Sequence, residues 1–180
     1  MRQGIIDRVG VHLRAVQEED FPLLTALRCD RSTQHLLLAY PDQYPPSSAA
    51  VRDWIARRTA EPGGAFLIIA DGGGHMLGFG QIVDVHQRGR FGKIGFALLK
   101  DVRGRGFGSQ AMRLLIAHAR DVLGLRKLLG EVHADNSGAM RLYEAVGFRR
   151  VGVLHAHYDD GTKFHDVILV EIALDGSPTP

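Results

Sequence analysis

The residues best suited to chemistry form a glycine-rich turn that consists of Arg103, Gly104, Arg105, Gly106, Phe107, Gly108 and Ser109. Glycine lets this backbone adopt positive φ angles and approach a ligand without a Cβ clash. The turn precedes a helix predicted over residues 111–123, so free N–H groups and the helix dipole favour an anion there. The two arginines add forked donors that suit phosphate. We therefore expect a site for a cofactor that carries a pyrophosphate.

Two common phosphate-binding motifs do not fit this turn. A P-loop needs Lys followed by Ser or Thr after its last glycine, and no such lysine is present here. The dinucleotide motif needs a third glycine where Ser109 stands and an acidic residue about 20 residues further on, whereas Glu131 lies beyond that distance. A dinucleotide fold also needs several βαβ units, and the pattern contains one. An NAD-binding enzyme is therefore only a remote alternative.

A second cluster follows on a short predicted helix over residues 137–146. Its members are Asn136, Leu142, Tyr143, Gly147 and Phe148. With both clusters in place, the chain resembles the acetyl-CoA-dependent N-acetyltransferases of the GNAT superfamily. The turn matches that family's R/Q-x-x-G-x-G/A loop, and the second cluster matches its N…LY…GF segment. The ending around residues 158–169 is similar to the branch of ribosomal-protein N-terminal acetyltransferases and spermidine acetyltransferases.

The resemblance implies a binding mode for acetyl-CoA as co-substrate. Pantetheine would lie between two parallel strands that splay apart, here residues 93–99 and 128–133, and the pyrophosphate would bind the glycine-rich turn. The matching backbone contacts are Phe96, Ala97, Leu98 and Leu99. Asn136 would cap its helix and contact the cofactor, and Tyr143 would contact the cofactor near its sulfur and act as general acid for the thiolate. A backbone N–H of Leu98 or Leu99 would stabilise the tetrahedral oxyanion.

The general base stays open, because the family uses different residues for it. Glu131 and His133 share one face of their predicted strand, and Asp84 and His86 share a face of another. We rank Glu131 first as a catalytic residue, because a carboxylate also attracts a cationic amine. His133, Asp84 and water alone are the alternatives.

Nine histidines raise the question of a metal site. If residues 160–161 form a two-residue turn, His157 pairs with Phe164, and His165 faces the side opposite to His155 and His157. A three-histidine site does not assemble on that hairpin, and we expect no metal ion.

The elements that position these residues alternate between strand and helix signals. Strands are expected at residues 11–16, 65–70, 76–85, 93–99, 128–133, 148–158 and 162–174. Two helices lie near residues 21–27 and 48–55, before those at 111–123 and 137–146. The crossover between residues 99 and 128 favours a right-handed parallel pair. We expect an α/β fold with a mixed, mostly antiparallel seven-stranded sheet, a central splayed parallel pair and about four helices. Residues 30–48 are expected to be a loop, a weak candidate for the acceptor site through Tyr40, Asp42 and Tyr44.

Composition sets the remaining bounds. The 180 residues are 45% hydrophobic and 23% charged, which is typical of one globular domain, expected here over residues 1–174 with a flexible tail at 175–180. The single Cys29 excludes a disulfide framework and fits a reducing cytoplasm. The net charge of +2 is too small to argue for nucleic acid, and no apolar run reaches the length of a membrane span. No signal peptide is recognised, so a cytoplasmic location is expected.

These observations lead to one functional expectation. The chain should transfer acetyl from acetyl-CoA to a primary amine of a small molecule or peptide, without a nucleic-acid or membrane partner and possibly as a homodimer. Direct attack in a ternary complex is favoured, because Cys29 is remote in sequence from both motifs. The alternative is a non-catalytic sensor that binds acyl-CoA, and the presence of Tyr143 and Asn136 argues against it.

Overall fold

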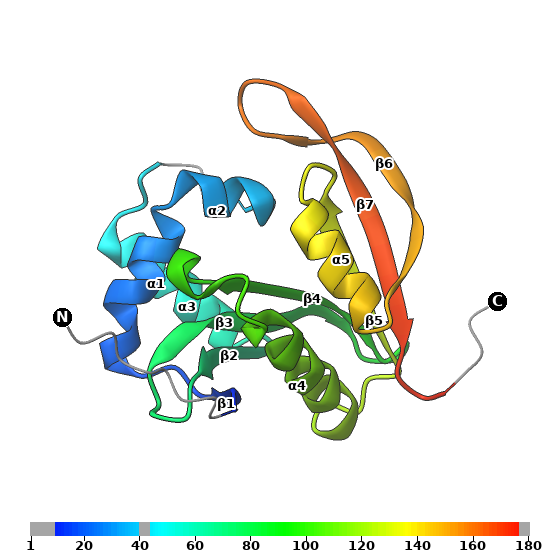
Figure 1. The fold of residues 1–180 in the computed structure, drawn as a ribbon, viewed down its shortest axis with the longest axis horizontal. Helices are drawn as coiled ribbons and strands as arrows, with labels where there is room; N and C mark the ends of the chain where they lie inside the picture. Colours follow the sequence, from blue (N-terminus) through cyan, green and yellow to red (C-terminus); the bar gives the residue numbers. More distant parts are fainter. Residues whose placement is uncertain (1–9, 40–43, 177–180) are drawn as a thin grey trace.

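The computed structural model describes residues 10–39 and 44–176 of the chain. Its strands form one sheet in the order β1-β2-β3-β4-β5-β7-β6 (Figure 1). The strands are β1 His12–Arg14, β2 Ala65–Ala70, β3 Met76–His86, β4 Phe91–Leu98, β5 Lys127–His133, β6 Arg149–Asp159 and β7 Phe164–Ala173. Within the described residues only β4 and β5 pair in parallel, and every other neighbouring pair is antiparallel. The mixed seven-stranded sheet expected from the sequence is confirmed.

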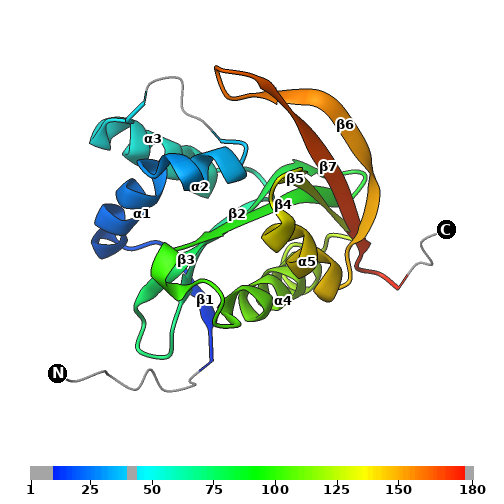
Figure 2. The ribbon, with the colours of Figure 1, turned by 45° about the horizontal axis from the view of Figure 1, so that its top comes forward.

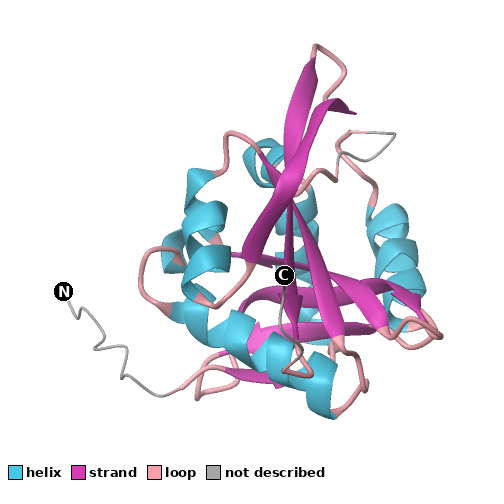
Figure 3. Ribbon diagram, turned by 90° about the vertical axis from the view of Figure 1, so that its right-hand side faces the viewer, coloured by secondary structure: helices cyan, strands magenta, loops and turns pink. Residues whose placement is uncertain are grey.

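Helices cover both faces of the sheet (Figures 2 and 3). They are α1 Phe21–Arg28, α2 Arg31–Leu36, α3 Ser48–Thr59, α4 Phe107–Asp121 and α5 Ser137–Ala145. Leu24 of α1 and Ile55 of α3 pack with Phe66 of β2 in one core cluster. Met112 of α4 and Tyr143 of α5 belong to a second cluster. A third cluster contains Leu98 of β4 and Ala111 of α4. Because side chains alternate along the strands, both faces of the sheet contribute to these clusters. None of the helices within these ranges has both the length and the apolar character that crossing a membrane requires.

The parallel pair separates soon after it begins. β4 and β5 pair at Phe91–Lys127, Gly92–Leu128 and Lys93–Leu129, and their ladder ends there. Beyond that point β4 stays paired with β3 as far as Leu98, and β5 stays paired with β7 as far as His133. Each strand is thus held by its outer neighbour while the inner edges part. This is the splayed pair that the sequence predicted.

The segment expected to be a loop over residues 30–48 contains the helix α2, so that expectation is wrong for residues 31–36. The hydroxyl of Ser32 donates to the Asp30 carboxylate at 3.0 Å, and the hydroxyl of Thr33 donates to the same group. Gln34 is fully buried and donates from Nε2 to the carbonyl of Leu27 at 2.8 Å. These bonds offset the weak apolar periodicity of the segment. Tyr40 and Asp42 lie outside the described residues, as do residues 177–180 of the expected tail.

The β6–β7 hairpin has a wider turn than the sequence predicted. Asp159 pairs with Phe164, so residues 160–163 connect the strands and the expected pair of His157 with Phe164 is wrong. The physical reason is the Asp160 carboxylate, which accepts the backbone N–H groups of Thr162 at 2.8 Å and residue 163 at 3.0 Å. An irregularity at residues 155–157, where Ala156 has a φ of +48°, then changes the register. His165 nevertheless lies on the side of the hairpin opposite to residues 155 and 157, as predicted, because His165 is buried while those two residues are exposed.

Candidate functional site

Two cavities meet where β4 and β5 diverge. The turn cavity, about 360 Å³, lies between the end of β4, the glycine-rich turn and α5. The charged cavity, about 240 Å³, lies beside β3, α1 and α3 and contains Lys93, Glu131 and Asp84. Both are lined by the same five residues, Leu36, Leu37, Phe96, Asn136 and Ala139. A molecule in one cavity can therefore reach a molecule in the other at the divided strand pair.

The peptide groups of β4 alternate between the two sides of the strand. Leu99 donates its N–H to the carbonyl of Leu77 at 2.9 Å, so its peptide group faces β3. By the alternation of an antiparallel ladder, Ala97 also faces β3, whereas Phe96 and Leu98 face the opening. Of the four expected backbone contacts only Phe96 and Leu98 turn their peptide groups to the opening, and of the two expected oxyanion donors, Leu98 and Leu99, only Leu98 does. Both roles stay predictions. This alternation was not anticipated from the sequence, where all four residues were expected to contact the cofactor.

The glycine-rich turn presents the start of α4 to the turn cavity. Gly104 and Gly106 have φ angles of +74° and +84°, and a Cβ built on either would meet no atom within 4 Å. Phe107, Gly108 and Ser109 form the first helical turn, whose N–H groups have no partner within the helix. Helix α4 begins at residue 107 and not at the predicted 111, so these N–H groups lie at the turn itself. The arrangement is suited to an anion.

The two arginines of the turn differ in their contacts. Arg103 donates from Nε to the carbonyl of Leu98 at 2.9 Å and from its terminal nitrogen to the hydroxyl of Thr33 at 2.9 Å. Its side chain therefore joins the turn to β4 and α2, a role that the sequence did not predict. Arg105 is exposed, and its expected contact with phosphate stays a prediction.

Tyr143 lies at the point where the strands part. Its side chain is buried, and its hydroxyl donates to the carbonyl of Ile94 at 3.3 Å. Burial, with a smaller effect from the negative charge of Glu131, raises the pKa of Tyr143 above its usual 10. The ring lies over Gly130, where an added Cβ would be 2.9 Å from Cε1 of Tyr143. The phenol is therefore a protonated hydrogen-bond donor at neutral pH, positioned by a glycine that the sequence analysis overlooked.

Asn136 has the capping role that was predicted. Its Oδ1 accepts the N–H of Ala139 at 3.1 Å at the start of α5. The same side chain borders both cavities. The predicted cofactor contact of Asn136 is compatible with this place and stays a prediction.

Glu131 is ion-paired within the charged cavity. Lys93 Nζ lies 2.8 Å from Glu131 Oε1 and 3.4 Å from Asp84 Oδ2. The hydrogen bond to Glu131 is the main cause of the raised pKa of Lys93. Lys93 was not a candidate from the sequence, because its place depends on the parallel register. That register pairs Lys93 with Leu129 and so places it diagonally beside Glu131. Glu131 and Asp84 are therefore near the opening, but a lysine ammonium already occupies the space between them.

The other candidates for a base lie elsewhere. His133 is fully buried, borders neither cavity, and accepts the N–H of Asp135 at Nδ1 at 3.2 Å. Burial is the main cause of its lowered pKa. The register of β3 breaks at Asp84, which has a φ of +51°, so the face expected to be shared with His86 is interrupted. His86 accepts the N–H of Gly89 at 2.8 Å and stacks on Phe91.

Arg28 is a functional candidate that sequence reasoning missed. It borders the charged cavity, lies 4.8 Å over the Trp54 ring, and donates to the carbonyl of Ala39 at 3.0 Å. Its Nε is buried without a hydrogen-bond partner, and no ion pair joins it to a carboxylate of the described chain. Burial, together with the positive charge of Arg58, lowers the pKa of Arg28. A half-buried guanidinium of this kind, which no carboxylate of the described chain neutralises, can bind an anionic group in the cavity.

Comparison with known proteins bears on both the sequence and the fold. A family model described as the acetyltransferase (GNAT) domain matches residues 11–149. The N-acetyltransferase YoaA of Bacillus subtilis is 28% identical over 89 residues, which cover 49% of this chain and 49% of that protein. A mycothiol acetyltransferase of Salinispora arenicola is 33% identical over 126 residues, or 66% of this chain and 39% of that protein. The matched segments thus span half or less of these relatives.

Solved structures share the fold at low sequence identity. The crystal structure of spermidine N-acetyltransferase from Vibrio cholerae in complex with CoA and spermine aligns with a TM-score of 0.83 at 18% identity. The alignment covers 91% of this chain and 95% of that one. At this identity the likeness establishes the architecture alone.

Proposed function

The chain belongs to the GNAT acetyltransferase family, and on this premise we propose that it transfers the acetyl group of acetyl-CoA to a primary amine by direct attack in a ternary complex. Acetyl-CoA is the co-substrate of this family. The observation that carries the proposal is the divided strand pair, where two cavities share a common wall. One cavity holds the cofactor and the other holds the amine.

The cofactor lies in the turn cavity. Its pyrophosphate accepts N–H groups from the first turn of α4, where the helix dipole adds to the attraction. Its pantetheine amides pair with the peptide groups of Phe96, which β3 leaves available, whereas the carbonyl of Leu98 already accepts Arg103. Gly108 supports this mode of binding, because a Cβ there would lie 3.2 Å from Leu142 and narrow the cavity.

The amine attacks the thioester carbonyl from the charged cavity. The nitrogen forms a bond to the carbonyl carbon, and the carbonyl oxygen becomes an oxyanion that accepts the N–H of Leu98. The C–S bond then breaks, and the nitrogen loses its proton to Glu131 or to water. A phenol with a pKa above 10 does not give up its proton to a thiolate, because the pKa of the corresponding thiol is about 8.5. Tyr143 therefore stabilises the departing thiolate by a hydrogen bond once its O–H turns from the carbonyl of Ile94 to the sulfur, which refines the general-acid role expected from the sequence.

The charges of the acceptor cavity favour an amine that also carries an anionic group. Arg28 and Arg58 border the cavity together with Lys93, and the carboxylates of Glu131 and Asp84 face that lysine. A polycation would meet the unneutralised Arg28 guanidinium at an energetic cost. An amino acid or another carboxylate-bearing amine would place its anion at Arg28 and its nitrogen at the divided strands.

Thiol release on mixing with acetyl-CoA and an amine panel tests the reaction. We expect turnover with at least one primary amine, and CoA binding without turnover across the panel would favour the alternative of an acyl-CoA sensor. A cytoplasmic location, a single domain over residues 1–174 and a homodimer stay predictions.

Acceptor choice is tested by pairing each amino acid with its carboxamide. A charge-assisted hydrogen bond contributes about 1.5–3 kcal/mol, so kcat/KM should favour the carboxylate by about 10- to 150-fold. Arg28→Gln should remove most of this preference. Arg57→Gln, an exposed arginine on α3, should keep it. A preference for the carboxamide or for a polyamine would refute the assignment of Arg28 while leaving acetyl transfer intact.

A further inference from the structure

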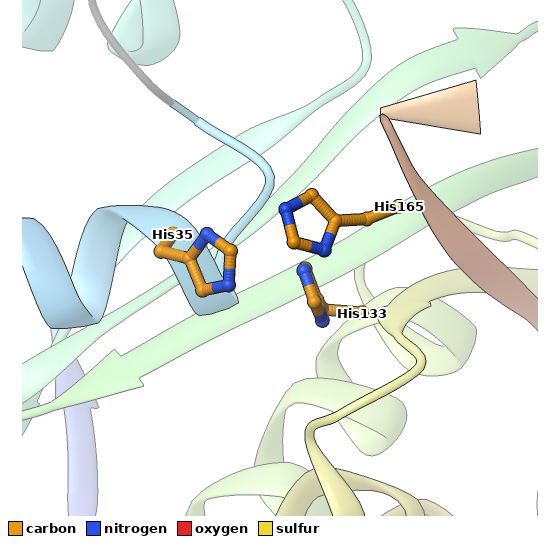
Figure 4. Close-up of side chains that lie close together, drawn as sticks. All are labelled: His35, His133 and His165. Carbon is orange, nitrogen blue, oxygen red and sulfur yellow. The ribbon is translucent and has the colours of Figure 1, made fainter. Parts of the chain in front are cut away.

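Three histidines from three separate elements converge beside the divided strands (Figure 4). His35 lies on α2, His133 ends β5, and His165 lies on β7. Their ring centroids are 4.2 Å, 4.8 Å and 4.6 Å apart for the pairs 35–133, 35–165 and 133–165. Each ring offers a nitrogen, and these nitrogens lie within 4.8 Å of one another. The cluster borders neither cavity and has no part in the proposed reaction.

One carboxylate orients two of the rings. Asp160 Oδ2 lies 2.7 Å from Nε2 of His165 and 3.8 Å from Nδ1 of His35. A hydrogen bond from Nε2 of His165 to Asp160 leaves Nδ1 of that ring as the nitrogen with a lone pair. A carboxylate that accepts a hydrogen bond from one ring nitrogen of a histidine commonly fixes the tautomer in which the other nitrogen binds a metal ion.

The third ring has a nitrogen that the protein does not satisfy. Nδ1 of His133 accepts the N–H of Asp135 at 3.2 Å, so without a metal ion the neutral ring carries its proton on Nε2. A cation at Nε2 requires the tautomer with the proton on Nδ1, and the bond from Asp135 is then given up. This Nε2 is buried and has no hydrogen-bond partner, in a side chain that is 0% exposed. A buried polar atom without a partner is uncommon in folded proteins, and a metal ion bound after the change of tautomer would satisfy this one.

We propose that His35, His133 and His165 bind one divalent transition-metal ion of the Zn²⁺ class. Three imidazoles with a fourth position for water are a known donor set for Zn²⁺, which also suits Co²⁺ and Ni²⁺. Bonds of about 2.0–2.1 Å in a tetrahedral site place donor nitrogens about 3.4 Å apart. Nitrogens now within 4.8 Å reach that spacing by rotations of the side chains.

The bound ion joins elements on opposite sides of the strand division. Leu36, the last residue of α2, and Leu37, its C-cap, directly follow His35 in sequence and belong to the shared wall of the two cavities. The other two ligands lie on β5 and β7, which belong to the far side of the division. The ion therefore links α2 to β5 and β7 and fixes the position of the wall that the two cavities share. This role does not depend on acetyl transfer.

Metal binding is measured on protein made without a polyhistidine tag and stripped with a chelator. Dialysis against Zn²⁺ should return one ion per chain, and Co²⁺ should give the visible absorption of nitrogen coordination. At about 100 times the Kd, Zn²⁺ should raise the Tm by about 5–10 °C.

Variants assign the ligands. His35→Ala removes a partly exposed ligand and should weaken Zn²⁺ binding at least about 100-fold, while Asp160→Asn should weaken it about 10- to 100-fold. His157→Ala is the matched control, because that histidine is exposed on β6, and it should leave Zn²⁺ affinity unchanged. His133→Ala leaves a cavity in the buried interior, so circular dichroism must show that this variant is folded before its Zn²⁺ affinity is compared.

Two outcomes overturn the proposal. One is a folded wild-type chain that takes up no stoichiometric Zn²⁺ or Co²⁺. The other is Zn²⁺ affinity that is the same in His35→Ala and His157→Ala. Neither readout involves acetyl-CoA, so either result leaves the proposed reaction untouched.

Discussion

Gly106 allows the anion site to be tested by charge alone. Its φ is +84°, and a Cβ built there meets no atom within 4 Å. Asn and Asp are the non-glycine residues that most readily adopt this conformation, and they are nearly equal in size. Gly106→Asn and Gly106→Asp therefore place similar steric bulk at the start of α4 and differ by one negative charge.

The expected effect on CoA affinity follows from the position of that charge. A carboxylate at residue 106 would lie about 6 Å from a phosphate bound to the first-turn N–H groups. With an effective dielectric constant between 20 and 80, repulsion is about 0.7–2.8 kcal/mol for each phosphate charge, and a diphosphate carries about two. The Asp variant should thus bind CoA at least about 10-fold more weakly than the Asn variant. Folding stability should change in the opposite sense, because an acidic residue at a helix N-terminus is stabilising by about 0.3–1 kcal/mol.

Gly124 provides the matched control at the other end of α4. It has a φ of +65°, and a Cβ there also meets no atom within 4 Å. The 15 residues of α4 put it about 22 Å from Gly106, well beyond a Debye length of about 8–10 Å. Calorimetric titration with CoA at low and high salt measures both pairs of variants. Equal Kd values for the Asn and Asp variants at position 106, or an equal difference at position 124, would refute the anion site.

Three further predictions concern Tyr143, Gly130 and Asp30. Tyr143→Phe removes the hydroxyl that hydrogen-bonds Ile94, and kcat should fall about 100-fold with CoA affinity within about twofold of wild type. Since burial raises the pKa of Tyr143 above 10, kcat/KM should increase with pH up to pH 10 as the amine deprotonates. A decrease in kcat/KM that begins before pH 10 as the pH is raised, and that is absent in Tyr143→Phe, would contradict this. Gly130→Ala places a Cβ 2.9 Å from Tyr143 Cε1, and urea unfolding should show about 1–3 kcal/mol of lost stability with a lower kcat, whereas Gly152→Ala, with no atom within 4 Å, should change neither. Burial, which alone would raise the pKa of Asp30, is outweighed by hydrogen bonds from neighbouring hydroxyls and a lysine, so that pKa falls from 3.8 to about 2. The stability that this carboxylate contributes is present above pH 3.8 and lost as the pH falls through 2, so wild type should lose about 1–2 kcal/mol more than Asp30→Asn over that range in thermal melts.

Local patterns in the sequence predicted most of the fold. Alternation and apolar runs located all seven strands, because most of the strands contribute buried apolar side chains to a core cluster. Ser47 caps α3 by accepting the N–H of Ala50 at 3.1 Å, which is the usual role of a serine directly before a helix. Helix α2 escaped prediction because it is six residues long and is stabilised by tertiary contacts of Gln34 and by Asp30, not by an apolar stripe.

The site was predictable where a motif is local and was not where distant segments meet. The glycine-rich turn and Asn136 are recognisable because their neighbours in sequence are also their neighbours in space. Arg28 gave no signal, since an arginine at the end of an amphipathic helix is usually solvated, and only the fold shows that its Nε is buried. Lys93 became visible only with the register of β4 and β5, which no local pattern specifies.

The histidines show the same limit most sharply. Strand alternation placed His165 on the inner face of the hairpin even though the turn was predicted two residues too short, because a shift of two residues preserves the face. Its partners could not follow from alternation, since His35 comes from the unpredicted α2 and His133 from β5. Helix α2 also holds Arg103 through Thr33 on the β4 side of the division. One short helix therefore contacts both flanks of the divided strands, and whatever fixes its position, an ion at the histidines included, also fixes the wall that the two cavities share.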